Sequence, residues 1–493
     1  MLTGRRHDVV GLAVLLGICV AFPLVASGTL VNIGVYALIY ALAALGLSLL
    51  MGLAGQVSLG QAGFFAIGAY TQAVLVTKYD AAGPLAALAA VALTMLAALL
   101  VGMPLLRLRG HYLALATLGF GIIVTVVATE SSYLGGTSGI FGISKPTLNN
   151  RTYDEPAEFF WLLTPVVLLG LLLARNLVES RVGRALGATN DSEVAAESLG
   201  VDTFRLRLQV FVVAGAYAGL AGVFFAHWLA VVNPNAANFP LSVKFLLMSV
   251  LGGLGTVYGA VVGAVAVEGL DEAMSRLIPR LVDGAVGEVE LIGFGLVLTA
   301  IMIFLPGGLH QLGQRLFALR RSRAHPANDR GDPEPADTAL PVRAEAPLPG
   351  AGRRPARGTT LLEVRGLTKH FGGVVAVDRV DLDVAAGEIV AMIGPNGAGK
   401  TTVFNMISGV LAPTEGTVTL SGRRIEGRKP HVFARARATR TFQNLQLFRS
   451  MTVLENVKVG RHLRSRAGLL RGLLVLPAWR EERAITADAR RVV

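Results

Sequence analysis

One run of residues in the C-terminal third of the chain has the types and the spacing needed to bind phosphate groups. It matches the pattern G-x-x-x-x-G-K-[ST] and continues into a second threonine, and its residues are Gly394, Pro395, Asn396, Gly397, Ala398, Gly399, Lys400, Thr401 and Thr402. The glycines allow a tight turn whose backbone N–H groups can face a phosphate. Lys400 supplies a positive charge for the β- and γ-phosphates, and the Thr401 hydroxyl can hold Mg²⁺. The run therefore predicts a site for a nucleoside triphosphate with Mg²⁺.

The residues on either side of this run predict a strand before it and a helix after it. Glu388–Ile393 is short and apolar, as a buried strand would be, and Thr401–Ser408 has the pattern of a helix start. Upstream, Leu361–Val364 and Val380–Val384 alternate as strands do. A glycine-rich turn that binds nothing is the alternative, but a strand and a helix around the pattern favour phosphate binding. We predict an α/β portion that begins at Thr359.

The composition of the whole chain indicates a membrane protein. Of the 493 residues, 53% are hydrophobic and only 16% are charged, and the mean hydropathy is +0.57. A soluble protein carries about 25% charged residues. The net charge of +12 reflects Lys and Arg in short loops and in the C-terminal third, as expected for cytoplasmic segments, so no nucleic-acid partner is expected. Cys19 is the only cysteine, which excludes a disulfide within the chain.

Long apolar runs predict a series of membrane-spanning helices. A span needs about 20 mostly apolar residues. If Arg5 and Arg6 lie in the cytoplasm, the basic residues that follow the fourth and sixth runs also lie there, in agreement with the positive-inside rule. The runs are Val9–Ala26, Asn32–Met51, Leu59–Thr77, Leu85–Leu106, Tyr112–Thr129, Phe159–Ala174 and Leu208–Leu229.

The last apolar runs of this region must contain a break. Leu241–Glu268 and Val289–Leu305, counted as two spans, would place the nucleotide-binding portion outside, whereas its nucleotide is cytoplasmic. The glycine-rich stretch Leu251–Gly255 is the expected place for the break, provided that protein or a water-filled cavity covers the irregular backbone. The membrane domain then has about ten helical segments, and both termini are cytoplasmic.

These patterns divide the chain into three parts. Residues 1–310 are predicted to form a transmembrane domain, residues 311–358 a disordered linker rich in Pro and Arg, and residues 359–493 an incomplete nucleotide-binding domain. The predicted fold class is an α-helical polytopic membrane domain followed by an α/β P-loop NTPase portion. The predicted location is the inner or plasma membrane of the cell, crossed several times.

Two further features lie near the phosphate-binding run. Phe371 precedes Gly394 by 23 residues, and a second stretch is Thr441-Phe442-Gln443-Asn444. Together with the run they resemble the ATP-binding-cassette (ABC) ATPases. The resemblance implies ATP and Mg²⁺ as cofactors, stacking of Phe371 on adenine, and a position for Gln443 close to Mg²⁺. Phe371 could instead be a half-buried aromatic at a strand end.

The chain departs from the ABC ATPase pattern in its last residues. The family's signature run, its metal-binding Asp, its catalytic Glu and its switch His are absent from this sequence. We therefore expect the chain to contact phosphates without completing hydrolysis by itself, as a truncated product, a fragment or part of a split gene would. Whether it acts as an enzyme stays open at this point.

Four motifs lie in the membrane-spanning part: Gly55–Tyr70, Arg109–Phe120, Gly135–Ile140 and Ser180–Leu186. Together they resemble the second permease of the branched-chain amino acid importers, over about residues 30–309. The resemblance implies that polar residues of the first motif line a pore, because a polar group in the bilayer is costly unless it faces the bundle or a cavity. These residues are Gln56, Ser58 and Gln61. The alternative is a role in packing alone, since the small residues of this motif let helices approach closely.

The polar segment Glu193–Gly200 lies between the sixth and seventh apolar runs and has a helical pattern. It resembles the cytoplasmic coupling helix of importers, which implies that it docks in a groove on the ATPase. That groove lies near Thr441–Asn444, the stretch that resembles the family's glutamine loop. The residues that carry this resemblance are Glu193, Ala195, Ala196 and Gly200. A solvated surface helix is the alternative.

The resemblances predict a subunit of an ATP-driven importer for branched-chain or hydrophobic amino acids. The implied partners are a second permease, a second ABC ATPase, an extracytoplasmic substrate-binding protein and membrane lipid. Two alternatives stay open: an importer of other amino acids, amides or urea, and a membrane-tethered nucleotide-binding protein that transports nothing.

Overall fold

A computed structural model describes most of the chain. The described residues are 17, 19, 21–148, 151–281, 295–296, 299, 303, 308–309, 355–442, 446–465, 467–473 and 475–491. Most of the first predicted span, most of Val289–Leu305, the predicted linker up to residue 354, and Gln443 lie outside this set. The described residues form two compact units. We call them the helical unit (17–190, 203–309 and 467–491) and the sheet unit (191–202 and 355–465).

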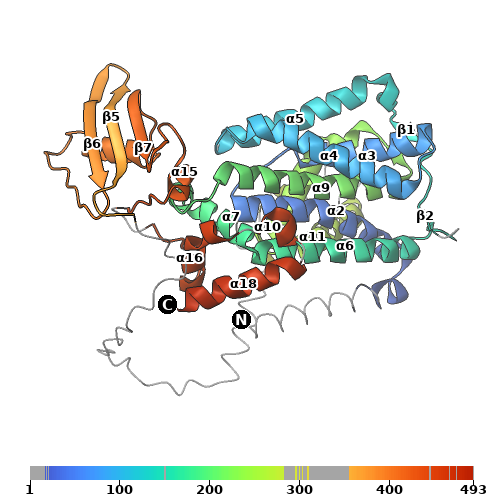
Figure 1. The fold of residues 1–493 in the computed structure, drawn as a ribbon. Coiled ribbons are helices and arrows are strands. Elements are labelled where there is room, and N and C mark those ends of the chain that lie inside the picture. Colours follow the sequence, from blue (N-terminus) through green and yellow to red (C-terminus); the bar gives the residue numbers. More distant parts are fainter. Residues whose placement is uncertain are drawn as a thin grey trace. The chain divides into compact units, whose positions relative to one another are not determined.

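The helical unit contains the predicted spans, which run side by side in Figure 1. Five of its helices are long and apolar enough to cross a membrane: α2 (Gly28–Ala54), α4 (Gly83–Leu105), α5 (His111–Glu130), α6 (Pro156–Glu179) and α9 (Thr203–Leu229). Between them lies α3 (Gln61–Lys78), which is rich in small residues. The five helices confirm the second, fourth, fifth, sixth and seventh predicted runs, whereas the third run, Leu59–Thr77, forms α3, which is not among the five.

The break predicted in the glycine-rich stretch is also present. Helix α10 (Phe239–Gly252) ends there, and α11 (Gly259–Leu281) begins a few residues later. Gly253, with φ of 107°, and Gly255, with φ of 76°, hold conformations that favour glycine. The chain therefore turns between two helices at a place where side chains with a Cβ would be strained.

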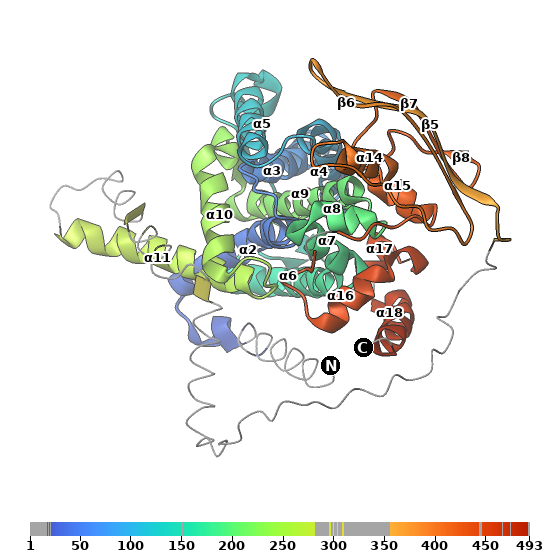
Figure 2. The ribbon, with the colours of Figure 1, turned by 90° about the vertical axis from the view of Figure 1, so that its left-hand side faces the viewer.

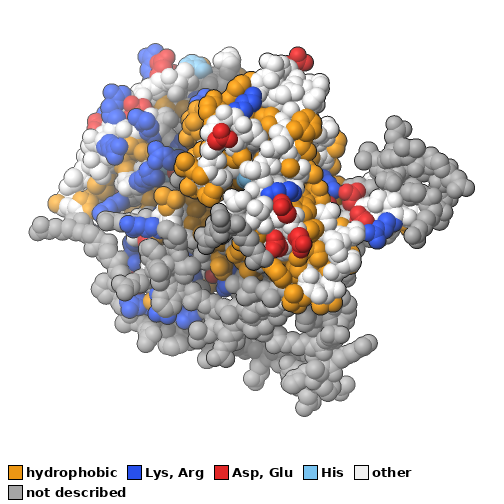
Figure 3. Space-filling model, turned by 90° about the vertical axis from the view of Figure 1, so that its right-hand side faces the viewer, with side chains coloured by type: hydrophobic (Ala, Val, Ile, Leu, Met, Phe, Trp, Pro, Cys, Tyr) orange, Lys and Arg blue, Asp and Glu red, His pale blue; other side chains and the backbone are white. Residues whose placement is uncertain are grey.

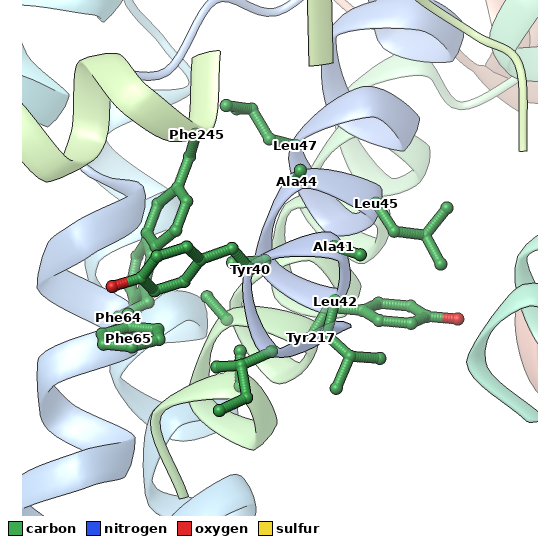
Figure 4. Packing of buried hydrophobic residues seen from close by; sticks show 14 of the residues in the cluster. Tyr40, Ala41, Leu42, Ala44, Leu45, Leu47, Phe64, Phe65, Tyr217 and Phe245 are labelled. Atoms are coloured by element: carbon green, nitrogen blue, oxygen red, sulfur yellow. The ribbon is translucent and has the colours of Figure 1, made fainter. Parts of the chain in front are cut away.

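Helix α2 forms the centre of this unit and is buried along most of its length. Tyr40 on α2 contacts the rings of Phe65, Phe225 and Phe245, which come from three other helices. Figure 4 shows Phe65 and Phe245 on the same side of α2 as the Tyr40 ring. Aromatic pairs of this kind add to the packing of the core.

The outer surface of the helical unit is apolar to an extent that suits lipid rather than water. Leu88 on α4 is 71% exposed, and Leu115 and Ile123 on α5 are 61% and 62% exposed. Figure 3 shows hydrophobic side chains spread over the face of the helices. Soluble proteins seldom expose apolar patches of this extent.

Short strands tie together the loops at one end of the helices. Strand β1 (Ile140–Phe141) pairs antiparallel with β4 (Val231–Val232), and β2 (Thr147–Leu148) pairs with β3 (Arg151–Thr152). Two 3₁₀ turns flank them, η1 (Ser132–Leu134) and η2 (Pro234–Ala237).

Three further helices, α7, α17 and α18, belong to the helical unit. Helix α7 (Arg181–Asp191) follows α6 directly, and Ser180 caps it by accepting hydrogen bonds from the N–H groups of Val182 and Gly183. Helices α17 (Leu469–Leu473) and α18 (Val475–Arg490) come from the C-terminal part of the chain and lie beside α6 and α7 (Figure 2).

The sheet unit is built on a four-stranded antiparallel sheet with the order β6-β5-β7-β8. The strands are β5 (Thr360–Phe371), β6 (Val374–Ala385), β7 (Glu415–Leu420) and β8 (Arg423–Arg424). Helix α14 (Lys400–Ile407) packs on the sheet through Val403 and Met406, which are buried against Val364 and Val418. The other helical elements are α8 (Glu193–Ser198), α15 (Pro430–Arg435), α16 (Val453–Gly460) and η3 (His462–Arg464).

One sequence expectation for this unit is wrong. Residues 388–393 do not form a strand, and Ile389 and Ile393 are 97% and 93% exposed rather than buried. An apolar run becomes a strand only where a neighbouring strand can accept its backbone hydrogen bonds. The described strands of this unit pair with one another, and none of them pairs with this run.

Candidate nucleotide site and coupling helix

The phosphate-binding run folds as a loop that leads into α14. Gly397 and Gly399 have φ of 88° and 82°, and Gly399 is the residue that precedes the first turn of the helix. A Cβ on Gly399 would lie 2.5 Å from the carbonyl oxygen of Ala376. Both the backbone conformation and the lack of space therefore require glycine at this position.

The charged and hydroxyl groups of the run sit on the first turn of α14. Lys400 Nζ donates hydrogen bonds to the carbonyl oxygens of Gly394 and Pro395, both at 2.6 Å, so its charge lies over the loop. Thr401 and Thr402 follow it on the same turn. The first N–H groups of a helix have no partner within the helix and carry partial positive charge, which suits phosphate oxygens. The residues present thus fit a nucleotide with Mg²⁺, for which Thr401 offers a hydroxyl ligand.

Phe371 lies at the end of the hairpin formed by β5 and β6. It pairs with Val374, and its side chain is 50% exposed. On β6, Ala376 and Val377 lie against Gly399 of the loop. The hairpin end is therefore close in the fold to the phosphate-binding loop and keeps part of an aromatic surface accessible.

Gln443 lies outside the described residues, but the segment just before it is anchored to α14. Arg440 Nη1 donates to Asn405 Oδ1 at 2.5 Å and to Ser408 Oγ at 3.1 Å, and its guanidinium lies 5.5 Å from the ring centre of Phe442. Sequence patterns did not single out Arg440, because an arginine after a helix has no distinctive spacing. These contacts hold the segment that ends at Phe442 against α14.

A cavity of about 610 Å³ lies within the sheet unit, between α14 and the segment that carries Arg440. Thr401 and Phe404 of α14 line it on one side, and Arg440 and Phe442 line it on another. Ser198 from α8 contributes to the same cavity. Helix α14, the segment 438–442 and α8 thus line the same cavity.

Helix α8 is the short helix predicted between the sixth and seventh apolar runs, and it packs against α15 in the sheet unit. Ser192 caps its start by accepting from the Ala195 N–H. Ala195 and Ala196 are buried, 4% and 0% exposed. Two contacts of charged or ionisable groups flank α8. Lys429 Nζ lies 3.9 Å from Glu197 Oε1, and His431 Nε2 lies 3.7 Å from Asp202 Oδ2, a pair that is ionic only when the histidine is protonated.

The ends of α8 are fixed by further contacts. Gly200, with φ of 89°, ends the segment, and a Cβ there would lie 2.3 Å from Leu463 Cδ2. At the other end, Asp191 Oδ2 accepts hydrogen bonds from the N–H and the hydroxyl of Ser450, at 2.9 and 2.7 Å. Ser192 Oγ donates to Gln446 Oε1 at 3.0 Å, three residues beyond Gln443. Glu193 is half-buried in the first turn. Asp191 and Ser192 were missed by sequence reasoning because the resemblance begins after them.

The three candidate pore residues are all buried in the helical unit. Gln61 Nε2 donates to the carbonyl oxygens of Ala43 and Ala214, both at 3.1 Å, which joins α2 to α9. Ser58 Oγ accepts from the Gly60 N–H. Gln56 differs, since its buried amide oxygen has no hydrogen-bond partner among the described residues. Of the three, Gln56 has the polar atom that a pathway could use, and the pore-lining role stays a prediction.

The small residues of the same motif hold helices at close range. A Cβ on Gly68 would lie 2.2 Å from the carbonyl oxygen of Gly219, so α3 and α9 are almost in backbone contact there. A Cβ on Gly60 would lie 2.4 Å from the carbonyl oxygen of Thr117. Thr117 Oγ1 accepts from the Leu59 N–H, which joins the first motif to the second. Packing is therefore one clear role of this motif.

Comparison with known proteins connects these features. The family described as "Branched-chain amino acid transport system / permease component" matches residues 29–306, more than half of the chain. The chain belongs to this family. The permease is 34% identical over 342 residues to the high-affinity branched-chain amino acid transport system permease protein LivM of Salmonella typhimurium, which covers 64% of this chain and 77% of that protein. LivM of Escherichia coli is 33% identical over the same coverage.

A second family, described as "ABC transporter", matches residues 377–491 of the permease chain. The corresponding relative is the branched-chain amino acid transport ATP-binding protein LivG of Salmonella typhimurium, 49% identical over 128 residues, which are 26% of this chain and 50% of that protein. The chain spans about half the length of this ATP-binding relative. A permease domain and an ABC ATPase domain are thus fused in one multi-pass membrane chain, and the ABC domain implies nucleotide binding.

Proposed function

We propose that the chain is a subunit of an ATP-driven importer for branched-chain or other hydrophobic amino acids. The observation that carries the proposal is the position of α8. This helix belongs to the permease sequence, yet it packs within the sheet unit beside the cavity that α14 lines. A permease that moved independently of nucleotide would have no use for such a contact. The relatives named above are components of branched-chain amino acid transport systems, which supports the same class of substrate.

The proposal assigns a role to each part of the site. Residues 394–402 hold the phosphates, Thr401 and Gln443 hold Mg²⁺, and Phe371 stacks on adenine. Helix α8 acts as the coupling helix, through Ala195, Ala196 and the residues around them. Residues 1–310 form the permease, 311–358 a linker and 359–493 the ATP-binding portion, with both termini in the cytoplasm. A second permease, a second ABC ATPase and an extracytoplasmic binding protein complete the transporter.

The nucleotide site is tested by binding of a fluorescent ATP analogue to the full chain in detergent. We expect Lys400→Ala to weaken binding at least about tenfold, which corresponds to about 1.4 kcal/mol, because the loop loses its only lysine charge. Arg423→Ala, at an exposed position on β8, is the matched loss of one positive charge and should bind normally. Equal affinity of the two variants would contradict the assignment of the site.

A further inference from the structure

Helices α17 and α18 belong to the ATP-binding part of the sequence but pack with the permease helices. The ABC transporter match extends to residue 491, whereas the structure groups the described residues from 467 onward with the helical unit. Figure 2 shows α17 and α18 next to α6 and α7. Two side chains of the permease bond to backbone carbonyls of this segment. Asn176 Nδ2 donates to Leu473 O, and Arg181 Nη1 donates to Ala467 O, both at 2.9 Å.

A two-pronged ion pair joins α7 to α18. Arg184 Nη1 and Nη2 donate to Glu482 Oε1 and Oε2, each at 2.7 Å. The two side chains are only 10% and 21% exposed, so solvent screens this pair less than a surface pair. A planar guanidinium that bonds both carboxylate oxygens fixes orientation as well as distance. The contact therefore selects one register of α18 on α7.

An apolar and close-packed contact lies next to the ion pair. Leu469 and Leu473 pack against the buried core of the helical unit. Between them, a Cβ on Gly472 would lie 3.0 Å from Ser180 Oγ and 3.2 Å from Ser180 Cβ. Ser180 is the residue that caps α7. The segment thus contacts the residue that caps the start of α7, and α7 leads directly into α8.

We propose that α17 and α18 form a second transmission contact between the ATP-binding portion and its own permease, in addition to α8. This inference rests on the proposed importer function. Gly472 contacts Ser180 just before α7, and Glu482 binds Arg184 in the first turn of α7. The last residue of α7, Asp191, accepts hydrogen bonds from Ser450. Residues of the ATP-binding part of the sequence therefore contact both ends of one permease helix. A displacement of the ATP-binding portion would then rotate α7 as well as move α8.

The contact is tested by a disulfide between Ser180→Cys and Gly472→Cys in the full chain in membranes. The Cβ separation of 3.2 Å is within a few tenths of an ångström of disulfide geometry. A protease site inserted at residues 311–358 is cleaved after oxidation, and the fragments are separated on a gel without reductant. We expect the two fragments to stay joined, and to part when reductant is added.

The matched control pairs Ser180→Cys with Gly468→Cys, since nothing lies within 4 Å of a Cβ at the exposed Gly468. Linkage of both pairs to the same extent, linkage of neither pair, or linkage of two separate chains would overturn the proposal. Because this readout needs no transport, it stands or falls separately from the importer function. The single native cysteine, Cys19, is buried and is present in every variant.

A charge exchange tests the transmission role in the assembled transporter. We expect Arg184→Glu to lower ATP-dependent uptake at least about fivefold, and Glu482→Arg in the same chain to restore it to within about twofold of wild type. Arg490→Glu reverses a charge at an exposed position of the same helix and should leave uptake unchanged. If uptake by Arg184→Glu equals uptake by Arg490→Glu, or if adding Glu482→Arg to Arg184→Glu does not restore uptake, the α7–α18 contact does not couple ATP to transport. Absence of uptake by the wild-type chain would instead refute the importer function.

Discussion

Two short segments of this chain pack in a different compact unit from the sequence domain to which they belong. Residues 191–202 come from the permease and pack in the sheet unit, whereas residues 467–491 come from the ATP-binding portion and pack in the helical unit. The first contact buries small side chains, Ala195 and Ala196, and an ion pair of 3.9 Å between Lys429 and Glu197 lies beside them. The second is centred on an ion pair of 2.7 Å with little exposure to solvent.

The two contacts differ in how firmly their side chains fix the position of the packed helix. The α8 contact buries small side chains, and its printed hydrogen bonds lie at the start of the segment, from Ser450 to Asp191 and from Ser192 to Gln446. A bidentate Arg–carboxylate pair resists both rotation and translation. We infer that the α18 contact, with its bidentate and little-exposed ion pair, is the firmer of the two.

Within the two contacts, the largest effect is expected from a bulky charge at α8. Ala196→Arg should abolish docking of α8, because Ala196 is 0% exposed and a long charged side chain cannot be buried there without cost. Uptake should fall more than about tenfold, whereas affinity of the full chain for a fluorescent ATP analogue should stay within about twofold of wild type. Val194→Arg, 43% exposed on the same helix, is the control and should transport normally. Normal uptake by Ala196→Arg would show that α8 does not couple.

For loss of the ion pairs, we expect a smaller effect, and the α18 pair should contribute more to stability than the α8 pair. Glu482→Gln should destabilise the full chain by about 1–3 kcal/mol, because Arg184 is left with a poorer partner in a weakly solvated place. Lys429→Met removes a side chain that is 56% exposed and 3.9 Å from Glu197, and should cost less than about 1 kcal/mol. Thermal unfolding in detergent measures both. If Lys429→Met lowers the melting temperature more than Glu482→Gln, the assignment of the α18 contact as the firmer one is wrong.

Some elements of the structure could be predicted from the sequence, and the α18 contact could not. The length of apolar runs specified α2 and α9, and the glycines specified the turn between α10 and α11, because each of these signals is local. The phosphate-binding loop was predictable for the same reason. The placement of α17 and α18 was not, since it depends on a pairing of Arg184 with Glu482 across about 300 residues. The strand expected at 388–393 failed on a similar point, because a strand needs a neighbour that its own residues do not reveal.

The smallest effect is expected at an exposed ion pair on the sheet. Arg365 bonds to both carboxylate oxygens of Asp383, at 2.6 and 2.8 Å, and this hydrogen bonding holds the pKa of Asp383 below its ordinary value. A lowered pKa in the folded state means that the pair contributes stability above the ordinary pKa and loses it as the pH falls through the folded value. Asp383→Asn should therefore cause a slight loss of stability at neutral pH and none at about pH 2, measured by thermal unfolding. A loss that persists at acid pH would show that the side chain acts through shape and not through charge.

The most direct test of the account is uptake by the transporter reconstituted in vesicles with its partner subunits, with ATP on the cytoplasmic side. Radiolabelled leucine should accumulate with the wild-type chain and with Arg423→Ala, and accumulation should disappear with Lys400→Ala. That result would establish that nucleotide bound by this chain drives its own permease. Accumulation by Lys400→Ala at the wild-type rate would contradict the account.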